Sequence, residues 1–239
     1  MGKFIVKESD WVQCDKRMAF SQPKYDSFNT SLLGLGDIKA DSKSSDAIAA
    51  FFDLEGFTNF SKQIEPHLSV PLFLSSFLGW LLDAIKQAVT EEKVPQGVKM
   101  WGPLPFFVKF MGDGLLVLWD LADTNEYARL NIVVGMERIC RDYKKEFLPT
   151  MTGRVVDPPP ALRCGLARGM VYSVGDGNDY VGSCINMAAR LQKIPGTTFA
   201  VNRRGFDLEQ MKPEHAFRKK IVIVQCPLEV WGSASWLSF

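Results

Sequence analysis

The stretch that most constrains the fold runs from Phe51 to Ser61, with the sequence FFDLEGFTNFS. An apolar run that begins at Ala47 ends here in one carboxylate, Asp53, as in a buried strand with an acid at its carboxyl end. The chain then turns through Gly56 into a segment that can open a helix. The first N–H groups of a helix have no partner inside it, so they favour an anion beside the acid. Taken alone, Asp53 is better explained as a helix cap than as a metal ligand.

A second acid lies in the clearest hairpin of the sequence, FFVKFMGDGLLVLW at residues 106–119. Two apolar runs flank Gly112-Asp113-Gly114, which is a tight-turn sequence. Asp113 alone is explained by the turn, because Asp-Gly is common there. In a ferredoxin-like core, however, the hairpin lies beside the first strand and brings Asp113 to Asp53. Two such carboxylates repel each other without a cation, so the pair predicts a divalent metal site.

The order of the expected elements indicates one α+β domain. After the first strand, at 47–53, they are a helix in two pieces at 60–89, a loop at 91–105, the hairpin, a helix at 124–147 and a bent or broken strand at 161–174. This order predicts a ferredoxin-like βαββαβ core with an antiparallel sheet. A C-terminal β/α extension completes it, with strands at 198–201, 221–225 and 228–231 and a short helix at 205–211.

Residues 1–45 show little periodicity and are interpreted as an N-terminal arm, which leaves 46–239 as the folded domain. The formal net charge of +1 gives no general attraction to nucleic acid, and we expect no nucleic-acid partner. The longest apolar stretch, 70–82, is too short to span a bilayer, and the N-terminus lacks the apolar core of a signal peptide. Five widely spaced cysteines fit reduced thiols. We therefore expect a cytoplasmic protein without membrane contact.

A third motif, DYVGSCINMAARL at 179–191, has the pattern of a short helix. Asn186 and Arg190 are four residues apart and share one helix face. On its own this pair is better explained as an exposed polar stripe. An arginine on such a face can also stabilise charge on a transferring phosphoryl group, and an asparagine can hold a ribose oxygen.

Together, FDLEGFT at 52–58, KFMGDG at 109–114 and DYVGSCINMAAR at 179–190 resemble motifs of the class III nucleotide cyclases, the adenylate and guanylate cyclase catalytic domain. The resemblance extends from about Asp46 to Trp231. No single motif is decisive, but the three in this order are specific. The resemblance makes 46–239 a catalytic domain that converts a nucleoside triphosphate to a 3′,5′-cyclic monophosphate and pyrophosphate.

The resemblance also implies a metal site on one protomer. Asp53, Asp113 and the backbone carbonyl of Leu54 would hold two divalent cations, Mg²⁺ or Mn²⁺. One cation lowers the pKa of the 3′-hydroxyl that attacks the α-phosphate, and the other holds the leaving pyrophosphate.

The remaining roles are divided between two chains. The backbone of Gly56, Phe57 and Thr58 would receive the β- and γ-phosphates. The resemblance implies a head-to-tail homodimer, so the partner chain would contribute Asn186 to orient the ribose and Arg190 to stabilise the transition state.

The base is harder to predict. Lys109 and Asp179 fall where adenylate cyclases of this family place a lysine and an acid that read adenine, which favours ATP over GTP. The sequences LPFFVKFMGDG and RCGLARGMVYSVGDGNDYVG are instead similar to those of the stand-alone pyrimidine cyclases of bacterial antiphage (Pycsar) systems. Those enzymes make cyclic UMP or cyclic CMP, which a separate effector reads. Arg168 and the bulky Trp101, Phe106 and Phe107 are expected to help close a pocket around the smaller ring.

We therefore expect UTP to be converted to cyclic UMP as a second messenger in antiphage defence. The alternatives are an adenylate cyclase and a non-catalytic, nucleotide-sensing domain. One departure concerns the lysine with which the family often holds the triphosphate, because Gln225-Cys226-Pro227 occupies that region here. Arg218, Lys219 or Lys220 can substitute for it, or can deter pairing at a strand edge.

Overall fold

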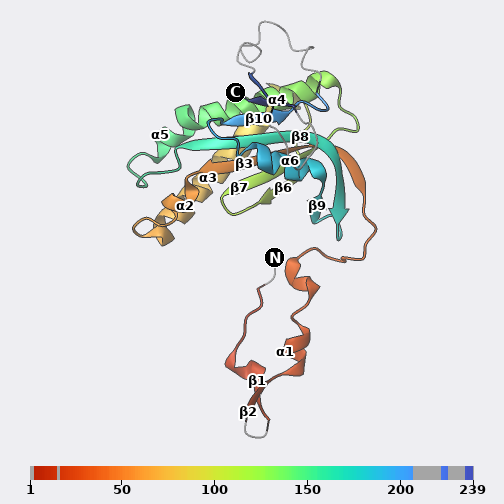
Figure 1. The fold of residues 1–239 in the computed structure, drawn as a ribbon, viewed down its shortest axis with the longest axis vertical. Coiled ribbons are helices and arrows are strands. Elements are labelled where there is room, and N and C mark those ends of the chain that lie inside the picture. The colour runs from red at the N-terminus through yellow and green to blue at the C-terminus, as the bar shows by residue number, and fades with distance from the viewer. Residues whose placement is uncertain (1–2, 15–16, 207–221, 226–234, 239) are drawn as a thin grey trace. The chain divides into compact units, whose positions relative to one another are not determined.

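The structure is a computed structural model that describes residues 3–14, 17–206, 222–225 and 235–238 (Figure 1). It contains two compact units. The larger comprises Ser45–Val171 and Gly182–Phe239, and the smaller comprises Met1–Ser44 and Tyr172–Val181. The predicted boundary at residue 45 between an arm and a catalytic domain stays a prediction.

The larger unit is built on one sheet, with the strand order β11-β12-β10-β8-β3-β7-β6. These strands are β3 (Ser44–Glu55), β6 (Phe107–Phe110), β7 (Gly114–Asp120), β8 (Ala161–Val174), β10 (Phe199–Asn202), β11 (Val222–Gln225) and β12 (Ser235–Ser238). The order β8-β3-β7-β6 is that of the predicted ferredoxin-like core, and β3, β7 and β6 pair antiparallel as expected. Beyond the core, β10 pairs with β8 in parallel, so the extension makes the sheet mixed.

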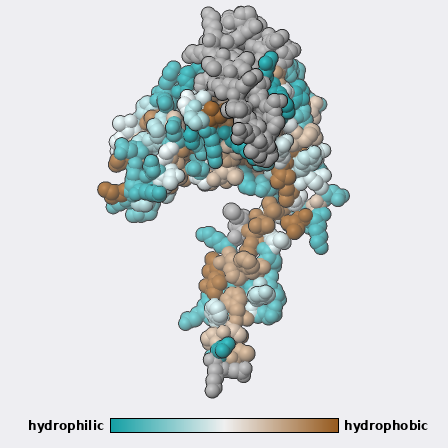
Figure 2. Space-filling model, viewed as in Figure 1, coloured by the Kyte–Doolittle hydropathy of each residue, from teal (hydrophilic) through white to brown (hydrophobic). Residues whose placement is uncertain are grey.

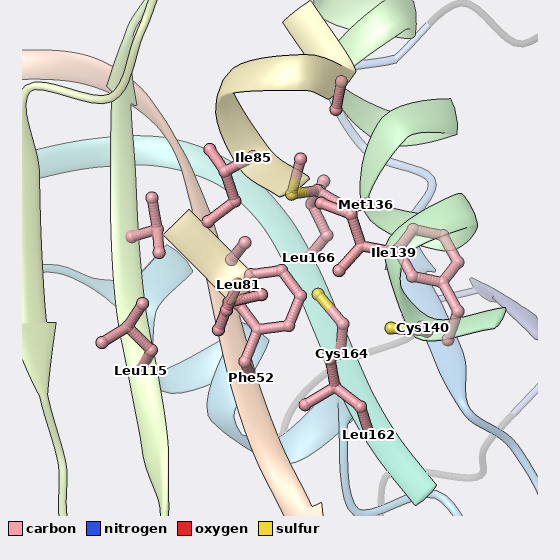
Figure 3. Close-up of a cluster of buried hydrophobic side chains, with 14 of the residues drawn as sticks. Phe52, Leu81, Ile85, Leu115, Met136, Ile139, Cys140, Leu162, Cys164 and Leu166 are labelled. Atoms are coloured by element: carbon pink, nitrogen blue, oxygen red, sulfur yellow. The ribbon is translucent and has the colours of Figure 1, made fainter. Parts of the chain in front are cut away.

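Two long helices, α3 (Pro66–Val89) and α4 (Glu126–Asp142), pack together on one face of the sheet. Every second residue of β3, including Phe52 and Leu54, enters the core beneath them, because side chains alternate between the two faces of a strand. Figure 3 shows part of this core, where Phe52 and Leu115 from the sheet lie close to Leu81 and Ile85 of α3. Burial of this apolar surface is the main stabilising contribution.

The shorter helices of the larger unit are α2 (Phe57–Phe60), a π-helical turn (Tyr143–Phe147), α5 (Leu148–Met151) and α6 (Ser183–Leu191). The π-helical turn extends α4 to the residue where the predicted helix ends. It brings Tyr143 into the core, where its hydroxyl donates a hydrogen bond of 2.7 Å to the carbonyl of Pro159. Burial raises the pKa of Tyr143 far above its usual value.

One prediction about local structure is wrong. The stretch 91–105 is not a loop throughout, because β4 (Thr90–Val94) and β5 (Gly97–Met100) form a hairpin whose many charged residues hide the strand pattern. The helix expected in two pieces is divided into α2 and α3. Helix α3 begins at Pro66 and continues through Pro71. Pro71 is exposed, so the carbonyl that loses its helical partner can bond to water. The strand at 161–174, expected to be bent or broken, runs as one strand.

Helix α3 is longer than the 70–82 stretch suggested, and by length and composition it could cross a membrane. One of its faces nevertheless belongs to the core, where Phe73, Phe77 and Leu81 are fully buried against the sheet and α4. The core helix of a water-soluble domain has the same features, so the helix is weak evidence for a membrane span.

The smaller unit contains the hairpin of β1 (Trp11–Cys14) and β2 (Arg17–Phe20), the helix α1 (Gln22–Asp26), single 3₁₀ turns at Glu8–Asp10 and Thr30–Leu33, and β9 (Asp179–Val181). None of the described residues between 3 and 44 is buried. Large apolar side chains such as Trp11, Met18 and Phe28 are exposed. Figure 2 shows hydrophobic, brown surface on the arm.

The remaining predictions can be checked only in part. Cys14, Cys140, Cys164 and Cys184 are free thiols, as expected. The strands predicted at 198–201 and 221–225 are β10 and β11. The strand at 228–231, most of the helix at 205–211, and Arg218, Lys219, Lys220, Cys226 and Pro227 lie outside the described residues.

Candidate active site

The structure brings the two predicted acids to neighbouring strand ends. In the β3–β7 ladder Asp53 lies opposite Gly114, and the N–H of Leu54 donates a 3.2 Å hydrogen bond to the carbonyl of Asp113. A Cβ atom on Gly114 would lie 2.0 Å from the carbonyl oxygen of Phe52, so only glycine allows this close approach. The predicted hairpin turn is confirmed, since the N–H of Met111 donates to the carbonyl of Gly114 at 2.9 Å.

The side chain of Asp53 lies on the sheet face opposite the α3–α4 core, because its neighbours Phe52 and Leu54 point into that core. Asp53 is only 9% exposed. Its oxygen Oδ2 accepts hydrogen bonds from Arg163 on β8, at 3.2 Å from Nε and 2.5 Å from Nη2. Among the described residues, Oδ1 receives no hydrogen bond. Half of the carboxylate is therefore available to a ligand.

Sequence reasoning missed Arg163. A nearly buried carboxylate needs a compensating positive charge, and Arg163 supplies it from a strand 110 residues along the chain. The alternation along β8 is a weak indication of this role. Arg163 and Gly165 share the strand face opposite Leu162 and Cys164, which enter the core.

The expected anion site follows β3 directly. Gly56 has a left-handed conformation (φ 74°) and precedes α2. The N–H groups of Asn59 and Phe60 both donate to the carbonyl of Gly56, at 3.0 and 3.1 Å. Phe57 and Thr58 therefore precede the first hydrogen-bonded amides of the turn, which is where N–H groups face outward.

Helix α6 carries Asn186 and Arg190 on the outside. Its buried face, with Cys184, Ala188 and Leu191, packs on β8, where a Cβ on Gly165 would lie 2.0 Å from the carbonyl oxygen of Ala188. Gly165 alternates with the core residues of β8, so α6 covers the sheet face that also carries Asp53. Asn186 and Arg190 are exposed. The predicted shared face of this pair is confirmed.

The two predicted base-reading residues lie in different units. Lys109 is a half-buried residue of β6, and it shares a cross-strand row with Leu116 and Phe51 on the face that carries Asp53. Asp179 begins β9 in the smaller unit, where its Oδ1 accepts a 2.9 Å hydrogen bond from the N–H of Tyr180.

Arg168 forms an ion pair within the larger unit. Its guanidinium binds Asp46, with Nη2 at 2.7 Å from Oδ2, and donates to the carbonyl of Gly205 at 2.9 Å. The hydrogen bonds with Asp46 raise the pKa of Arg168. Asp46 is at the opposite end of β3 from Asp53. The expectation that Arg168 helps to close a base pocket stays a prediction. Trp101 lies edge-on to Tyr127 at the start of α4.

One cavity is also distant from the acids. It has a volume of about 700 Å³ and lies at the far end of β7, where Asp120, Leu104 and Asn125 are among its lining residues.

The donor set at the strand tips fits a hard divalent cation. Asp53 Oδ1, the Leu54 carbonyl and the Asp113 carboxylate are all oxygen donors, which Mg²⁺ and Mn²⁺ prefer. No cluster of three or more His, Cys, Asp or Glu side chains exists within the described part of the chain. A metal here would therefore use two carboxylates, a carbonyl and oxygens from water or substrate.

Solved structures with the same fold are nucleotide cyclase domains. The adenylyl cyclase CyaB from P. aeruginosa is 14% identical, with a TM-score of 0.59 over 84% of this chain and 96% of that one. The guanylyl cyclase Cya2 is 18% identical, with a TM-score of 0.56 over 83% of this chain and 92% of that one. A non-canonical dimeric guanylyl cyclase domain from the aquatic fungus Blastocladiella emersonii is 20% identical, with a TM-score of 0.51 over 82% and 96%.

No family model and no curated protein matches the sequence. The structural likenesses establish the fold, and they include domains named for two different nucleotides. This α+β fold with a curled sheet is the fold of the class III cyclase catalytic domain.

Proposed function

We propose that the protein is a metal-dependent nucleotide cyclase, which converts a nucleoside triphosphate to a 3′,5′-cyclic monophosphate and pyrophosphate. One observation carries the proposal: Asp53 lies opposite Gly114, so the acid of the first core strand and the acid of the hairpin tip occupy adjacent strand ends. The cyclase fold and the outward-facing Asn186 and Arg190 support it.

In this proposal Asp53, Asp113 and the Leu54 carbonyl hold two divalent cations, Mn²⁺ or Mg²⁺. When bound, such cations activate the 3′-hydroxyl and neutralise the leaving pyrophosphate. Arg163 compensates the charge of Asp53 in their absence. The guanidinium of Arg163 would also be able to bind a phosphate group, which it matches in geometry and charge. The backbone of Gly56, Phe57 and Thr58 receives the β- and γ-phosphates.

The active unit in this proposal is a homodimer. Asn186 and Arg190 are exposed on α6, so a second copy can approach this face of the helix. The partner's copy of this pair would orient the ribose and stabilise charge on the α-phosphate.

We place UTP first among the substrates, with ATP as the alternative, and assign base recognition to Lys109 and Asp179. The fold does not decide the base, because solved relatives of this fold include adenylyl and guanylyl cyclases. A cyclic pyrimidine nucleotide would act in antiphage defence through a separate effector in the cytoplasm, without contact to nucleic acid or membrane.

The test is to incubate the purified protein with Mn²⁺ and each of the four nucleoside triphosphates and to identify products by mass. We expect one cyclic monophosphate, and none from Asp53→Ala protein. Mixing Asp53→Ala with Arg190→Ala protein should restore part of the activity, because a mixed dimer contains one intact site. Activity that is unaffected by Asp53→Ala would disprove the catalytic proposal. Binding of a triphosphate without turnover would favour the sensing alternative.

A further inference from the structure

The end of the arm is joined to the turn that precedes Asp179. The N–H of Asp176 donates to the carbonyl of Leu35 at 3.1 Å, and the N–H of Asp37 donates to Asp176 Oδ2 at 3.0 Å. These two reciprocal bonds lie within the smaller unit and connect segments 139 residues apart in sequence.

A second set of bonds lies next to the first. The N–H of Ser173 donates to the carbonyl of Lys43 at 2.9 Å, and the N–H of Lys43 donates to Ser173 Oγ at 2.8 Å. The hydroxyl of Ser42 donates to the carbonyl of Ser173, also at 2.8 Å. Ser173 is 7% exposed, whereas Ser42 and Lys43 are exposed, so these bonds are partly buried. We call residues 35–43, with Ser173 and Asp176, the arm clamp.

Two glycines make the arm clamp possible. Gly36 (φ +72°) would place a Cβ 2.1 Å from Asp176 Oδ2, and Gly175 (φ +63°) would place one 1.9 Å from the carbonyl oxygen of Leu35. Neither position accepts a side chain, both because of the left-handed backbone and because of these contacts. The arm and the turn therefore each carry a glycine where they contact the other segment.

The arm clamp holds the turn that leads into β9. Val174 pairs with Asp179 across this turn, and Gly175 and Gly177 both have left-handed backbones inside it. A turn with two glycines has many conformations when nothing fixes it. The position of Asp179 therefore depends on the residues that hold the turn.

We propose that the arm clamp is a positioning element for nucleobase selection, which fixes the β8–β9 turn and thereby the carboxylate of Asp179. This inference rests on the proposed function, in which Asp179 reads the base. In this proposal the arm acts through Asp179 and not on the reacting atoms. Releasing it changes the affinity for the base and leaves the phosphate chemistry intact.

The experiment compares two glycine variants of the full chain. Gly175→Ala introduces a methyl group against Leu35, whereas Gly177→Ala adds the same methyl group at φ +82° in the same turn, with the hydroxyl of Tyr180 3.6 Å away. Both variants carry backbone strain, but only the first breaks the arm clamp. Hydrogen exchange at the amides of Asp37 and Asp176 reports whether the clamp has opened.

We expect Gly175→Ala to raise KM for the preferred triphosphate about tenfold and to reduce its discrimination against the other three, with kcat changed less than threefold. Gly177→Ala should change KM less than Gly175→Ala does. Asp176→Asn keeps an acceptor oxygen for the Asp37 N–H and should stay near wild type, whereas Asp176→Ala should follow Gly175→Ala.

Three results would overturn the inference. The first is faster exchange in Gly175→Ala with KM and base discrimination unchanged. The second is an equal effect of the two glycine variants, which would assign the change to strain in the turn. The third is a rise in KM with exchange at Asp37 and Asp176 unchanged. If the wild-type protein neither binds nor cyclises any of the four triphosphates, the proposed function fails first, and that failure is visible without any variant.

Discussion

Two aspartate–arginine pairs connect the same two strands, and they differ in what they leave open. Asp53 pairs with Arg163 near one end of β3, and Asp46 pairs with Arg168 near the other. At Asp46 both carboxylate oxygens accept bonds, and the guanidinium also binds the carbonyl of Gly205. At Asp53 both bonds reach Oδ2, and Oδ1 is left for a ligand. The Asp46–Arg168 pair uses both carboxylate oxygens, whereas the Asp53–Arg163 pair uses one.

Burial strengthens the contrast. The side chain of Asp53 is 12% exposed and that of Asp46 is 37% exposed. Placing an incompletely bonded carboxylate in the less exposed position is unfavourable for folding alone. Such a local loss of stability is typical of functional sites. Both pairs consist of an aspartate and an arginine. Their geometry therefore decides which aspartate makes only a structural contact and which is a candidate metal ligand.

The largest effect should come from the aspartates. We expect Asp53→Asn to reduce cyclase activity by about 10³-fold or more, because the amide is a poor ligand for the metal, while Asp46→Asn keeps most of the activity. Initial rates with Mn²⁺ and the preferred triphosphate provide the measurement, with circular dichroism as a control for folding. Equal losses in the two variants would remove the distinction between the pairs.

The arginines should differ in their response to metal. Arg163→Gln removes the positively charged partner of Asp53 and should lower the free energy of unfolding by about 2–3 kcal/mol. Mn²⁺ should restore part of that stability, because it can neutralise the same carboxylate. Arg168→Gln breaks a more exposed pair and should lower stability by about 1 kcal/mol, with no recovery in Mn²⁺.

Chemical denaturation with and without 1 to 10 mM Mn²⁺, roughly the excess needed over a weak site, measures this difference. An equal stabilisation of both variants by Mn²⁺ would argue against a metal at Asp53.

Between the two arginines lies Gly165, which sets the distance between β8 and α6. Gly165→Ala places a methyl group 2.0 Å from the carbonyl of Ala188 and should lower stability by about 2 kcal/mol while shifting Asn186 and Arg190. Gly169→Ala is the matched control, because its Cβ would lie 3.2 Å from the Cβ of Cys184. Thermal unfolding and kcat measured together test the prediction, and equal effects of both changes would refute it.

The smallest effect concerns pH. Burial raises the pKa of the Cys184 thiol to about 11 from the ordinary value of 9.0, and the charge of Asp46 contributes. The folded protein keeps this thiol protonated more readily than the unfolded chain does. Its contribution to stability is therefore fully present below pH 9.0 and is lost as the pH rises through about 11.

Denaturation of wild type and Cys184→Ala between pH 8 and pH 11, roughly the range around these pKa values, should show a smaller loss in the variant. Parallel curves for the two proteins would contradict the assignment to Cys184.

Several elements were predictable because their signals are local. The buried strand at β3, the Gly112-Asp113-Gly114 turn and the helical face of Asn186 and Arg190 each depend on periodicity or turn chemistry within a few residues. The β4–β5 hairpin was missed because exposed, charged strands carry no apolar alternation. The C-terminal strand β12 was missed as well.

The sequence by itself determined that an acid ends a buried strand, that a second acid occupies a hairpin tip, and that an Asn–Arg pair shares a helix face. Only the tertiary structure decided that Arg163 compensates Asp53, that Arg168 belongs to Asp46, and that the arm holds the turn before Asp179. The physical reason is that periodicity fixes which face a side chain occupies. Its partner depends on strand order and register, which arise from packing between residues distant in the chain.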